Sequence, residues 1–489
     1  MSDTRAHGRS CNSPLLTDLP DECLVLIFGL LSIPERCRSV PPVCRRWRTL
    51  CASPELVRTV SIEAKLSYCV YSGTVPLRQQ MHSLFLWLHT HVAPHVQRLS
   101  LNLLAPYRRA DWDDDSLDDE PGKLADEEAV MAELPQALVG LLGAACAAGQ
   151  LRELSLEIPH VQVHLGPWLL PAAGTLRSLS LNQEYTLLEV PVAAGLHRLT
   201  KLQELALCVD EGNILFRPGC RLPSQSLTQL YLTVVNPAEF QPLPSQVSTL
   251  SALRALWLNG IFTTCSSDAL TGLPSLRCLR MCNCWALPGC LSQLTSLREL
   301  TVSQNWELSG LQLTAAAQEA VDDSLPFLSV GVAELRRLTS LLLRVSDHLS
   351  ISTLPANLGH DLPLLRRFAW SGKREDEGAL PIGMTSLRSA ALPSPVAQRS
   401  LAQLAAARRL ELLALNDSGL YSLHGQPVPG EGRQQQHALA VQAPQQLPSL
   451  RRLELTLSRA DFQNAAAAVH GLAPALVVEP FDSWQWCTA

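Results

Sequence analysis

Hydrophobic positions recur along most of this chain in the pattern Leu-x-x-Leu-x-Leu, where x is usually polar or small. Twelve copies lie between residues 151 and 455, and a weaker copy, VQRLSL, begins at residue 96. The twelve copies begin at residues 151, 176, 202, 227, 253, 276, 297, 338, 365, 387, 410 and 450. Most successive copies start 21 to 27 residues apart, so each copy belongs to a repeating unit of that length.

The alternation inside each copy predicts a short β-strand. Side chains of a strand point alternately to its two faces, so the leucines at the fourth and sixth positions enter a core while the residues between them face outward. A single unit cannot bury its own leucines, but stacked units form a continuous parallel sheet. The segments that lead from one strand to the next, which we call the returns, lie on the other side of the leucine core. From about residue 95 to 480 the chain therefore resembles the leucine-rich-repeat family. The predicted fold class is α/β, with a curved parallel sheet and a helical or irregular outer face.

Three insertions interrupt the repeats, near residues 105–150, 303–337 and 421–449. The first contains an acidic run over 111–128, which predicts a solvated loop leading into a helix near 129–148. The second contains TAAAQEAVDD, which predicts an extra helix. The third is rich in Gly, Pro and Gln over 424–446, so we expect a mobile loop there.

The beginning of the chain has a different pattern, since residues 19–31 read LPDECLVLIFGLL. Pro20 suits the first position of a helix, and acidic residues in the first turn favour the helix dipole. Leu24, Ile27, Phe28 and Leu31 follow the spacing of one buried helix face. The other side of this helix is apolar too, with Val25, Leu26 and Leu30. A helix that is apolar all round needs cover on every side.

Two further short helices are predicted before residue 60. Pro34 opens the second, and the pair Pro41-Pro42 separates it from a third that presents Val43, Trp47 and Leu50 at helical spacing. A three-helix unit of about 45 residues is too small to be comfortably stable alone. It can cover only part of the first helix, so the sequence predicts a partner at this surface.

The Leu-Pro start, the Ile-Phe pair and the block VCRRWR at 43–48 together resemble an F-box, over about residues 16–60. In that family three helices bind the Skp-type adaptor of a cullin-RING ubiquitin ligase, and a carboxy-terminal repeat domain selects the substrate. The family has a Leu-Ser-like helical connection where this chain has Pro41-Pro42, so the second helix is expected to be short. The resemblance implies adaptor contacts from Leu19, Pro20, Leu24, Ile27, Phe28, Leu31, Val43, Cys44 and Trp47. An alternative is that these helices only cap the open end of the solenoid.

The predicted organisation follows from these patterns. Residues 1–15 form a disordered N-terminus, 16–60 an F-box, 61–94 a helical linker and 95–480 the leucine-rich-repeat domain. The resemblance implies a substrate-recognition subunit of an SCF-type ligase, with a Skp-type adaptor, a cullin reached through it, and a protein target as partners. The alternative is a leucine-rich-repeat scaffold without ligase association, such as a cytoskeletal or ciliary assembly factor.

A target-binding patch is predicted where consecutive repeats place large residues at their fifth positions. Tyr231, Trp257 and Arg280 are consecutive there, and these residue types are enriched in binding hot spots. With Asn259 and Gln304 beside them, they form the predicted recognition patch. The alternative is that these side chains pack against their neighbours or against an inserted loop.

Arginine occupies the second position in eight of the twelve copies, at residues 152, 177, 254, 277, 298, 366, 388 and 451. These residues could line one rim of the sheet and attract an acidic partner. The alternative is that they are ordinary solvated residues that pair with a following glutamate, as in Arg152-Glu153 and Arg298-Glu299.

The net charge and the apolar runs of the chain bear on its expected partners and location. A formal charge of -6 gives no general attraction to nucleic acid or to an anionic membrane, and neither is an expected partner. The start of the chain lacks the apolar core of a secretory signal, and no apolar run is long enough to span a bilayer, so we expect a cytoplasmic or nuclear protein.

Neither the cysteines nor the known catalytic motifs point to chemistry by this chain. Fifteen dispersed cysteines predict reduced thiols, and Cys278, Cys282, Cys284 and Cys290 lack the paired spacing of a zinc knuckle. No nucleophile motif, phosphate loop or zincin helix is present. The sequence therefore predicts a protein that is not an enzyme and needs no cofactor or metal.

Overall fold

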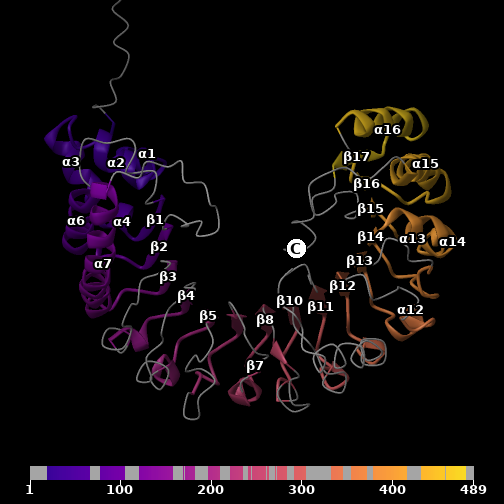
Figure 1. The fold of residues 1–489 in the computed structure, drawn as a ribbon, viewed down its shortest axis with the longest axis horizontal. Helices are drawn as coiled ribbons and strands as arrows, with labels where there is room; N and C mark the ends of the chain where they lie inside the picture. Colours follow the sequence, from indigo (N-terminus) through magenta and orange to yellow (C-terminus); the bar gives the residue numbers. More distant parts are fainter. Residues whose placement is uncertain are drawn as a thin grey trace, which may run out of the picture. The chain divides into compact units, whose positions relative to one another are not determined.

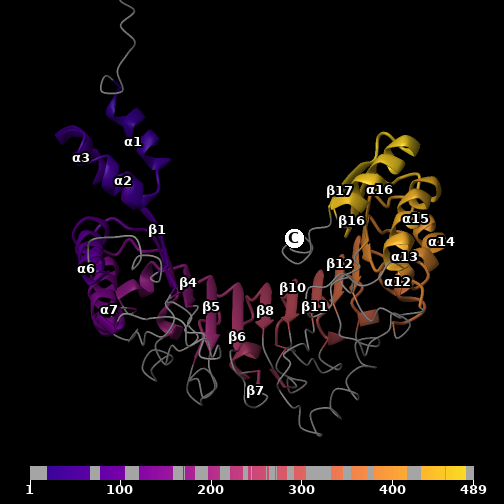
Figure 2. The same cartoon turned by 45° about the horizontal axis from the view of Figure 1, so that its top comes forward.

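The structure is a computed structural model in which the chain divides into two compact units, residues 1–183 and 184–489. It describes residues 19–65, 77–104, 121–157, 169, 171–181, 196–209, 221–234, 241–243, 245–259, 262–263, 270, 272–282, 291–303, 332–344, 354–371, 378–415, 431–457 and 459–480. Helices and strands succeed one another in the order of the chain (Figures 1 and 2).

Unit 1 begins with four short helices, which we call the helical domain. They are α1 (Asp21–Gly29), α2 (Ile33–Ser39), α3 (Arg45–Cys51) and α4 (Pro54–Val57). Pro20 caps α1 instead of occupying its first turn, and the helix ends at Gly29, so Leu31, which the spacing placed on its buried face, lies beyond it. Ser32 and Glu35 form a reciprocal capping box at the start of α2. As the proline pair predicts, α2 is only seven residues long.

Val43 does not belong to the third helix. Cys44 caps α3, and its Sγ accepts a hydrogen bond from the Trp47 N–H at 3.4 Å. Val43 therefore lies in the turn before the helix, where its side chain is 54% exposed. The predicted spacing of Val43, Trp47 and Leu50 along one helix was wrong, because the turn that follows the proline pair includes Val43.

The core of the helical domain is built from α1, α3, α4 and residues that flank the helices, such as Val40 at the end of α2. Its buried residues are Leu24, Phe28, Val40, Cys51 and Leu56. The Phe28 and Trp47 rings meet edge to face, with centroids 5.1 Å apart. This edge-to-face contact ties α1 to α3.

A parallel sheet follows the helices in unit 1. It comprises β1 (Thr59–Lys65), β2 (Arg98–Leu104), β3 (Glu153–Glu157) and β4 (Ser178–Leu181), paired in that order. Between these strands lie α6 (Leu77–Trp87), the π-helical turn η2 (Leu88–Val92), α7 (Pro121–Ala147) and the 3₁₀ turn η3 (Pro171–Gly174). The helix α7 begins before the predicted residue 129.

The strand β1 was not predicted, since residues 61–94 were expected to be a helical linker. Its sequence, VRTVSI at 57–62, is the same repeat with Val and Ile in place of leucine. Val57, Val60 and Ile62 are buried at the repeat's leucine positions. A search that accepted β-branched residues would have found this strand.

Unit 2 contains the remaining strands, whose parallel pairing follows chain order. They are β5 (Glu204–Val209), β6 (Gln229–Val234), β8 (Ala255–Asn259), β10 (Cys278–Cys282), β11 (Glu299–Ser303), β12 (Ser340–Arg344), β13 (Arg367–Ser371), β14 (Ser389–Leu392), β15 (Leu412–Leu415), β16 (Arg452–Leu455) and β17 (Val477–Pro480). The short strands β7 (Gln241–Pro242) and β9 (Phe262–Thr263) pair separately. In both units, every strand predicted from a Leu-x-x-Leu-x-Leu copy begins two residues after that copy's first leucine.

The returns of unit 2 change along the chain. The early returns hold the 3₁₀ turns η4 (Leu196–Arg198) and η6 (Ser245–Thr249), whereas the later ones hold α-helices. These helices are α12 (Leu358–Asp361), α13 (Ser394–Arg399), α14 (Leu401–Ala406), α15 (Glu431–Gln446) and α16 (Arg459–Leu472), and they lie along one side of the strands in Figure 1. No helix in the described parts of the chain has both the length and the apolar character needed to cross a membrane.

The helix α15 corrects the prediction of a mobile loop for residues 431–446, whereas 424–430 lie outside the described residues. Leu439, Ala440 and Ala443 are buried along one side of it, at helical spacing. Gln436 belongs to the same buried face, where its Nε2 donates to the Leu415 carbonyl oxygen at 3.1 Å. The many Gln residues of this segment obscured the helical spacing of its apolar residues, so its composition wrongly indicated a loop.

The buried side chain of Arg36 links the second and fourth helices. Its Nη1 donates to the Leu56 carbonyl oxygen at 2.8 Å, and its Nη2 donates to the Leu31 carbonyl oxygen at 3.3 Å. We expect Arg36→Met to leave both carbonyl groups unsatisfied and to destabilise the helical domain by about 2–3 kcal/mol. Hydrogen exchange of the amides of α1 and α3 measures the change. The exposed Arg48→Met is the control, and equal effects of the two substitutions would contradict the assignment.

Candidate functional site

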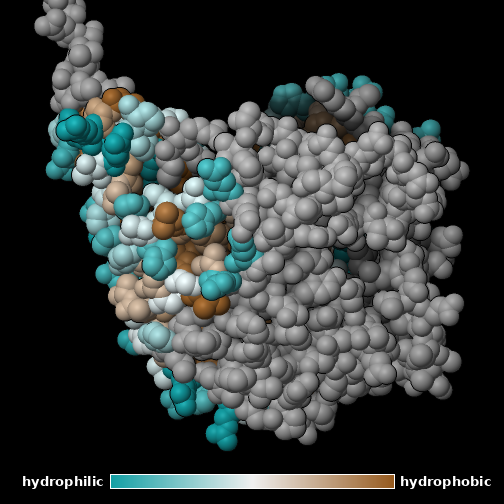
Figure 3. All heavy atoms as spheres, turned by 60° about the vertical axis from the view of Figure 1, so that its left-hand side comes forward, coloured by the Kyte–Doolittle hydropathy of each residue, from teal (hydrophilic) through white to brown (hydrophobic). Residues whose placement is uncertain are grey.

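An uncovered apolar surface lies on the helical domain. Leu30 is 87% exposed, Leu26 73%, Val43 54% and Ile27 37%. We call the three that lie on or next to α1, namely Leu26, Ile27 and Leu30, the apolar patch. The other side of α1, with Leu24 and Phe28, is buried in the core. Figure 3 shows apolar surface among hydrophilic surface in this part of unit 1.

An ion pair fixes the beginning of α1 against α3. Arg46 forms a salt bridge with Asp21 at 2.6 Å, and its Nη2 donates to the Leu19 carbonyl oxygen at 2.7 Å. Both charged side chains are about half exposed, so the pair orients the chain more than it stabilises it. Arg46 thus holds the Leu19-Pro20 segment beside the third helix.

In unit 2 the sheet presents an open face, which we define by the third, fifth and seventh positions of each repeat. The leucines at the fourth and sixth positions, such as Leu256 and Leu258, are buried on the other face. The strand register aligns the fifth positions side by side, and Tyr231, Trp257 and Arg280 are direct neighbours on β6, β8 and β10. The repeat spacing predicted this adjacency.

These three side chains form a stack, which we call the aromatic patch. The Tyr231 and Trp257 rings are parallel to within 4°, with centroids 3.9 Å apart. The Arg280 guanidinium carbon lies 5.7 Å from the centroid of Trp257, at cation–π distance. The expected alternative of packing against neighbours is thus partly realised, because the three side chains pack on one another while each keeps part of its surface exposed.

Polar groups surround the aromatic patch. The Tyr231 hydroxyl donates to Gln229 Oε1 at 3.2 Å. Burial raises the pKa of Tyr231, the Glu204 carboxylate raises it further and the Arg280 guanidinium lowers it. Asn259, at the end of β8, is exposed in register with Cys282 on β10. Gln304, the fifth predicted member, lies outside the described residues.

The accessible part of the fifth-position row ends before the last strands. Ala391, Ala414 and Glu454 occupy this row on β14, β15 and β16, but they are only 0–3% exposed. Thr301 and Leu342, on β11 and β12, remain partly exposed. In unit 2 the fifth positions from β5 to β13 are therefore the partly exposed ones that can meet a ligand.

The buried thiol of Cys146 and the half-buried thiol of Cys278 should react slowly with alkylating agents. Burial raises the pKa of Cys278 to about 11, helped by the nearby Glu299 carboxylate, and burial alone raises the pKa of Cys146 to about 12. Raised values keep a thiol protonated at neutral pH, and the thiolate is the nucleophile. At pH 7.5 we expect iodoacetamide to label the exposed Cys23 at least ~100-fold faster than either, as measured by peptide mass spectrometry. Comparable rates would contradict the burial of these thiols.

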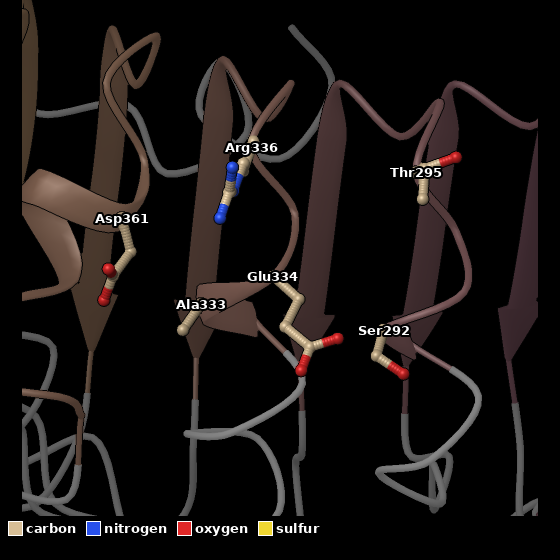
Figure 4. Close-up of a pocket in the computed structure, with 6 residues that line it drawn as sticks. All are labelled: Ser292, Thr295, Ala333, Glu334, Arg336 and Asp361. Carbon is tan, nitrogen blue, oxygen red and sulfur yellow. The ribbon is translucent and has the colours of Figure 1, made fainter.

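A shallow pocket lies among the returns that precede β11, β12 and β13. It is lined by Ser292, Thr295, Ala333, Glu334, Arg336 and Asp361. Figure 4 shows Glu334 between Asp361 and Ser292. Charged groups of both signs line this pocket, and in the part of the chain that the structure describes no three metal-ligating side chains come together. Of the four cysteines weighed for zinc, Cys284 and Cys290 lie outside the described residues.

Comparison with known families identifies the helical domain. The family model described as F-box-like matches residues 16–63. The chain combines an F-box-like domain with a leucine-rich-repeat fold. The match extends into β1, so the F-box-like domain ends within the first strand of the sheet.

Solved structures similar to this chain are repeat proteins with low sequence identity. An internalin (inlF) from Listeria monocytogenes is 14% identical, with a TM-score of 0.34, and the match covers 70% of this chain and 83% of the internalin. The TLR13 chain of a TLR13–ssRNA13 complex is 14% identical, with a TM-score of 0.38, and 88% of this chain matches 62% of it. Human 5T4 is 20% identical, with a TM-score of 0.29, and the match covers 51% of this chain and 75% of 5T4. Curated protein sequences gave no match.

The predicted adaptor residues fall into three groups according to their burial in the F-box-like domain. Leu24 and Phe28 are 0% and 2% exposed, so they build the core and cannot touch a partner in this conformation. Leu19, Leu31, Cys44 and Trp47 are partly buried, whereas Pro20, Ile27 and Val43 are exposed. Leu26 and Leu30, which were not among the predicted contacts, are the most exposed apolar side chains there. Their place on the second apolar side of the first helix was the signal that could have found them.

Proposed function

We propose that this protein is the substrate-recognition subunit of an SCF-type cullin-RING ubiquitin ligase. An F-box-like domain followed by leucine-rich repeats is typical of non-catalytic protein-interaction adapters. F-box domains generally bind Skp-type adaptors, and through such an adaptor this chain would join a cullin. Its place of action would be the cytoplasm or the nucleus.

The observation that carries this proposal is the apolar patch of the F-box-like domain. Leu26 and Leu30 project from α1, on the side away from the core of their own domain. Exposed leucines are common singly, but an apolar cluster of this kind marks an interaction surface. Burial of such a surface against an adaptor is the main source of affinity for a domain this small.

The sheet of unit 2 would hold the target, with the aromatic patch as its recognition site. Tyr, Trp and Arg are the residues most enriched at binding hot spots. The ligase chemistry would belong to other subunits. This chain would contribute proximity, by holding the target close to a ubiquitin-charged enzyme.

Co-purification with a Skp-type adaptor tests the proposal. We expect the wild-type chain to retain the adaptor through affinity purification and gel filtration, and the target to accumulate when the proteasome is inhibited. If the wild-type chain retains no adaptor, the proposal fails and the alternative of a scaffold without ligase association takes its place.

A further inference from the structure

A row of exposed arginines runs along the edge of the unit 2 sheet at which the strands begin. Each of these residues immediately precedes a strand, namely Arg254 before β8, Arg277 before β10 and Arg298 before β11. The backbone joins them directly. The Arg277 N–H donates to the Arg254 carbonyl oxygen, and the Arg298 N–H donates to the Arg277 carbonyl oxygen, each at 2.8 Å. These three residues, which we call the arginine row, are therefore one strand spacing of about 4.8 Å apart.

The three arginines of the row form no salt bridge among the described residues, although Glu299 follows Arg298 in the chain. All three side chains are exposed, and no ion pair joins any of them to a described carboxylate. In unit 1 the expected pair Arg152-Glu153 is not formed either, because Glu153 pairs with Arg98 on the neighbouring strand at 3.0 Å. Arg152 and Glu153 are neighbours in the chain, so their side chains point to different sides. Arg98 and Glu153 are in register on neighbouring strands, so their side chains point to the same side.

The aromatic patch lies beside this row. Trp257 on β8 lies three residues beyond Arg254, which precedes that strand, and Arg280 on β10 lies three residues beyond Arg277, which precedes β10, so each separation is about 10 Å along the chain. Four arginines thus lie within about three residues of one another along neighbouring strands, against two carboxylates, Glu299 on β11 and Glu204 on β5. This region is positive although the whole chain carries a formal charge of -6.

The stacking of the aromatic rings distinguishes between two classes of polyanion. Proteins that bind single-stranded nucleic acid offer open aromatic faces to successive bases. Here one face of Trp257 is covered by Tyr231, and Arg280 lies over the ring from the next strand on the other side. Trp257 therefore has no free face for a base. The partly exposed rings and the guanidinium groups suit a peptide with carboxylates and an apolar side chain.

We propose that the arginine row and the aromatic patch together bind an acidic peptide segment of the target protein. Carboxylates of an extended segment would meet Arg254, Arg277 and Arg298, which span about 10 Å, or about three residues of extended chain. An aromatic or aliphatic side chain of the same segment would lie against the edges of Tyr231 and Trp257. This inference rests on the proposed function only in taking the unit 2 sheet as the target-binding surface.

Selection from a displayed library of random 16-residue peptides on the full-length protein tests the proposal. We expect peptides selected by the wild type to be about threefold richer in Asp and Glu than the input, because charge complementarity sets partner choice. The triple variant Arg254→Gln, Arg277→Gln, Arg298→Gln should select no acidic excess. The triple variant Arg366→Gln, Arg388→Gln, Arg451→Gln removes the same charge at the same repeat position on later strands and should select like the wild type.

Affinities measured by fluorescence anisotropy complete the test. We expect the best selected peptide to bind the first triple variant and the Trp257→Ala variant at least ~10-fold more weakly than the wild type. The proposal is overturned if the peptides selected by the wild type have no excess of Asp and Glu, or if the two triple variants select alike. It is also overturned if acidic peptides do not bind, whereas a 15-nucleotide oligouridylate binds the wild type and is weakened by the first triple variant and by Trp257→Ala. Thermal melting of each variant checks its fold.

The same preparations separate this proposal from the ligase function. Retention of a Skp-type adaptor is measured on the wild type in parallel. Adaptor retention without acidic peptides would overturn the binding surface alone, whereas acidic peptides without adaptor retention would overturn the ligase function alone.

Discussion

Replacing Leu26 and Leu30 by glutamate should abolish retention of a Skp-type adaptor while the F-box-like domain stays folded. Both side chains are more than two-thirds exposed, so they contribute little to the domain's own core. Burying a leucine side chain in an interface contributes about 1.5–3 kcal/mol, and two such losses weaken binding by roughly 10²- to 10⁴-fold. Introducing two carboxylates into an apolar contact adds a desolvation cost.

Adaptor affinity measured by surface plasmon resonance checks this expectation. Leu86→Glu is the matched control, because Leu86 is 59% exposed on α6, outside the F-box-like domain. It should bind the adaptor like the wild type. Unchanged binding of the Leu26→Glu, Leu30→Glu double variant would refute the assignment of the apolar patch as the adaptor surface.

Phe28→Ala should eliminate adaptor retention by a different route, through loss of the fold. Phe28 is 2% exposed and packs against Trp47, Leu24 and Val40 in the core of α1–α4. Truncating a buried phenylalanine costs about 3–5 kcal/mol, which is comparable to the whole stability of so small a domain. Hydrogen exchange should therefore show loss of protection across α1 to α3.

Two comparisons separate unfolding from loss of a contact. Ile27→Ala changes the neighbouring residue on the same helix, whose side chain is 37% exposed, and it should keep most of the protection of α1–α3. Protection of β8 to β11 in unit 2 should be the same in both variants as in the wild type. If Phe28→Ala kept full protection of α1, the placement of this ring in the core would be wrong.

The Leu26→Glu, Leu30→Glu variant tests the exposed side of α1 in adaptor binding, and Phe28→Ala tests its buried side in folding. The sequence of α1 is apolar all round, and spacing alone placed Ile27 and Leu31 on the same buried face as Leu24 and Phe28. The structure buries only Leu24 and Phe28 completely, because α1 ends at Gly29 and its neighbours α3 and α4 cover a narrow strip of it. Periodicity gives the direction of a side chain but not the width of the surface that its neighbours cover.

Repeats were predictable where their leucines are regular and were missed where other residues replace them. Every strand predicted from a leucine copy is present, because alternation with a fixed register leaves one choice of face. The strand β1 was missed because Val and Ile fill its leucine positions, and the helix α15 was missed because Gln436 occupies its buried face. In both cases tertiary burial outweighed the local composition.

The sequence by itself determined the repeat register, the strand order and the F-box-like beginning of this chain. It also placed Tyr231, Trp257 and Arg280 on neighbouring strands, because parallel strands in register bring equal repeat positions together. Only the tertiary structure decided which apolar side chains of α1 stay exposed, that the two rings stack on each other, and that Arg254, Arg277 and Arg298 lack a described carboxylate partner. These outcomes depend on neighbours that are distant along the chain, and local spacing carries no information about them.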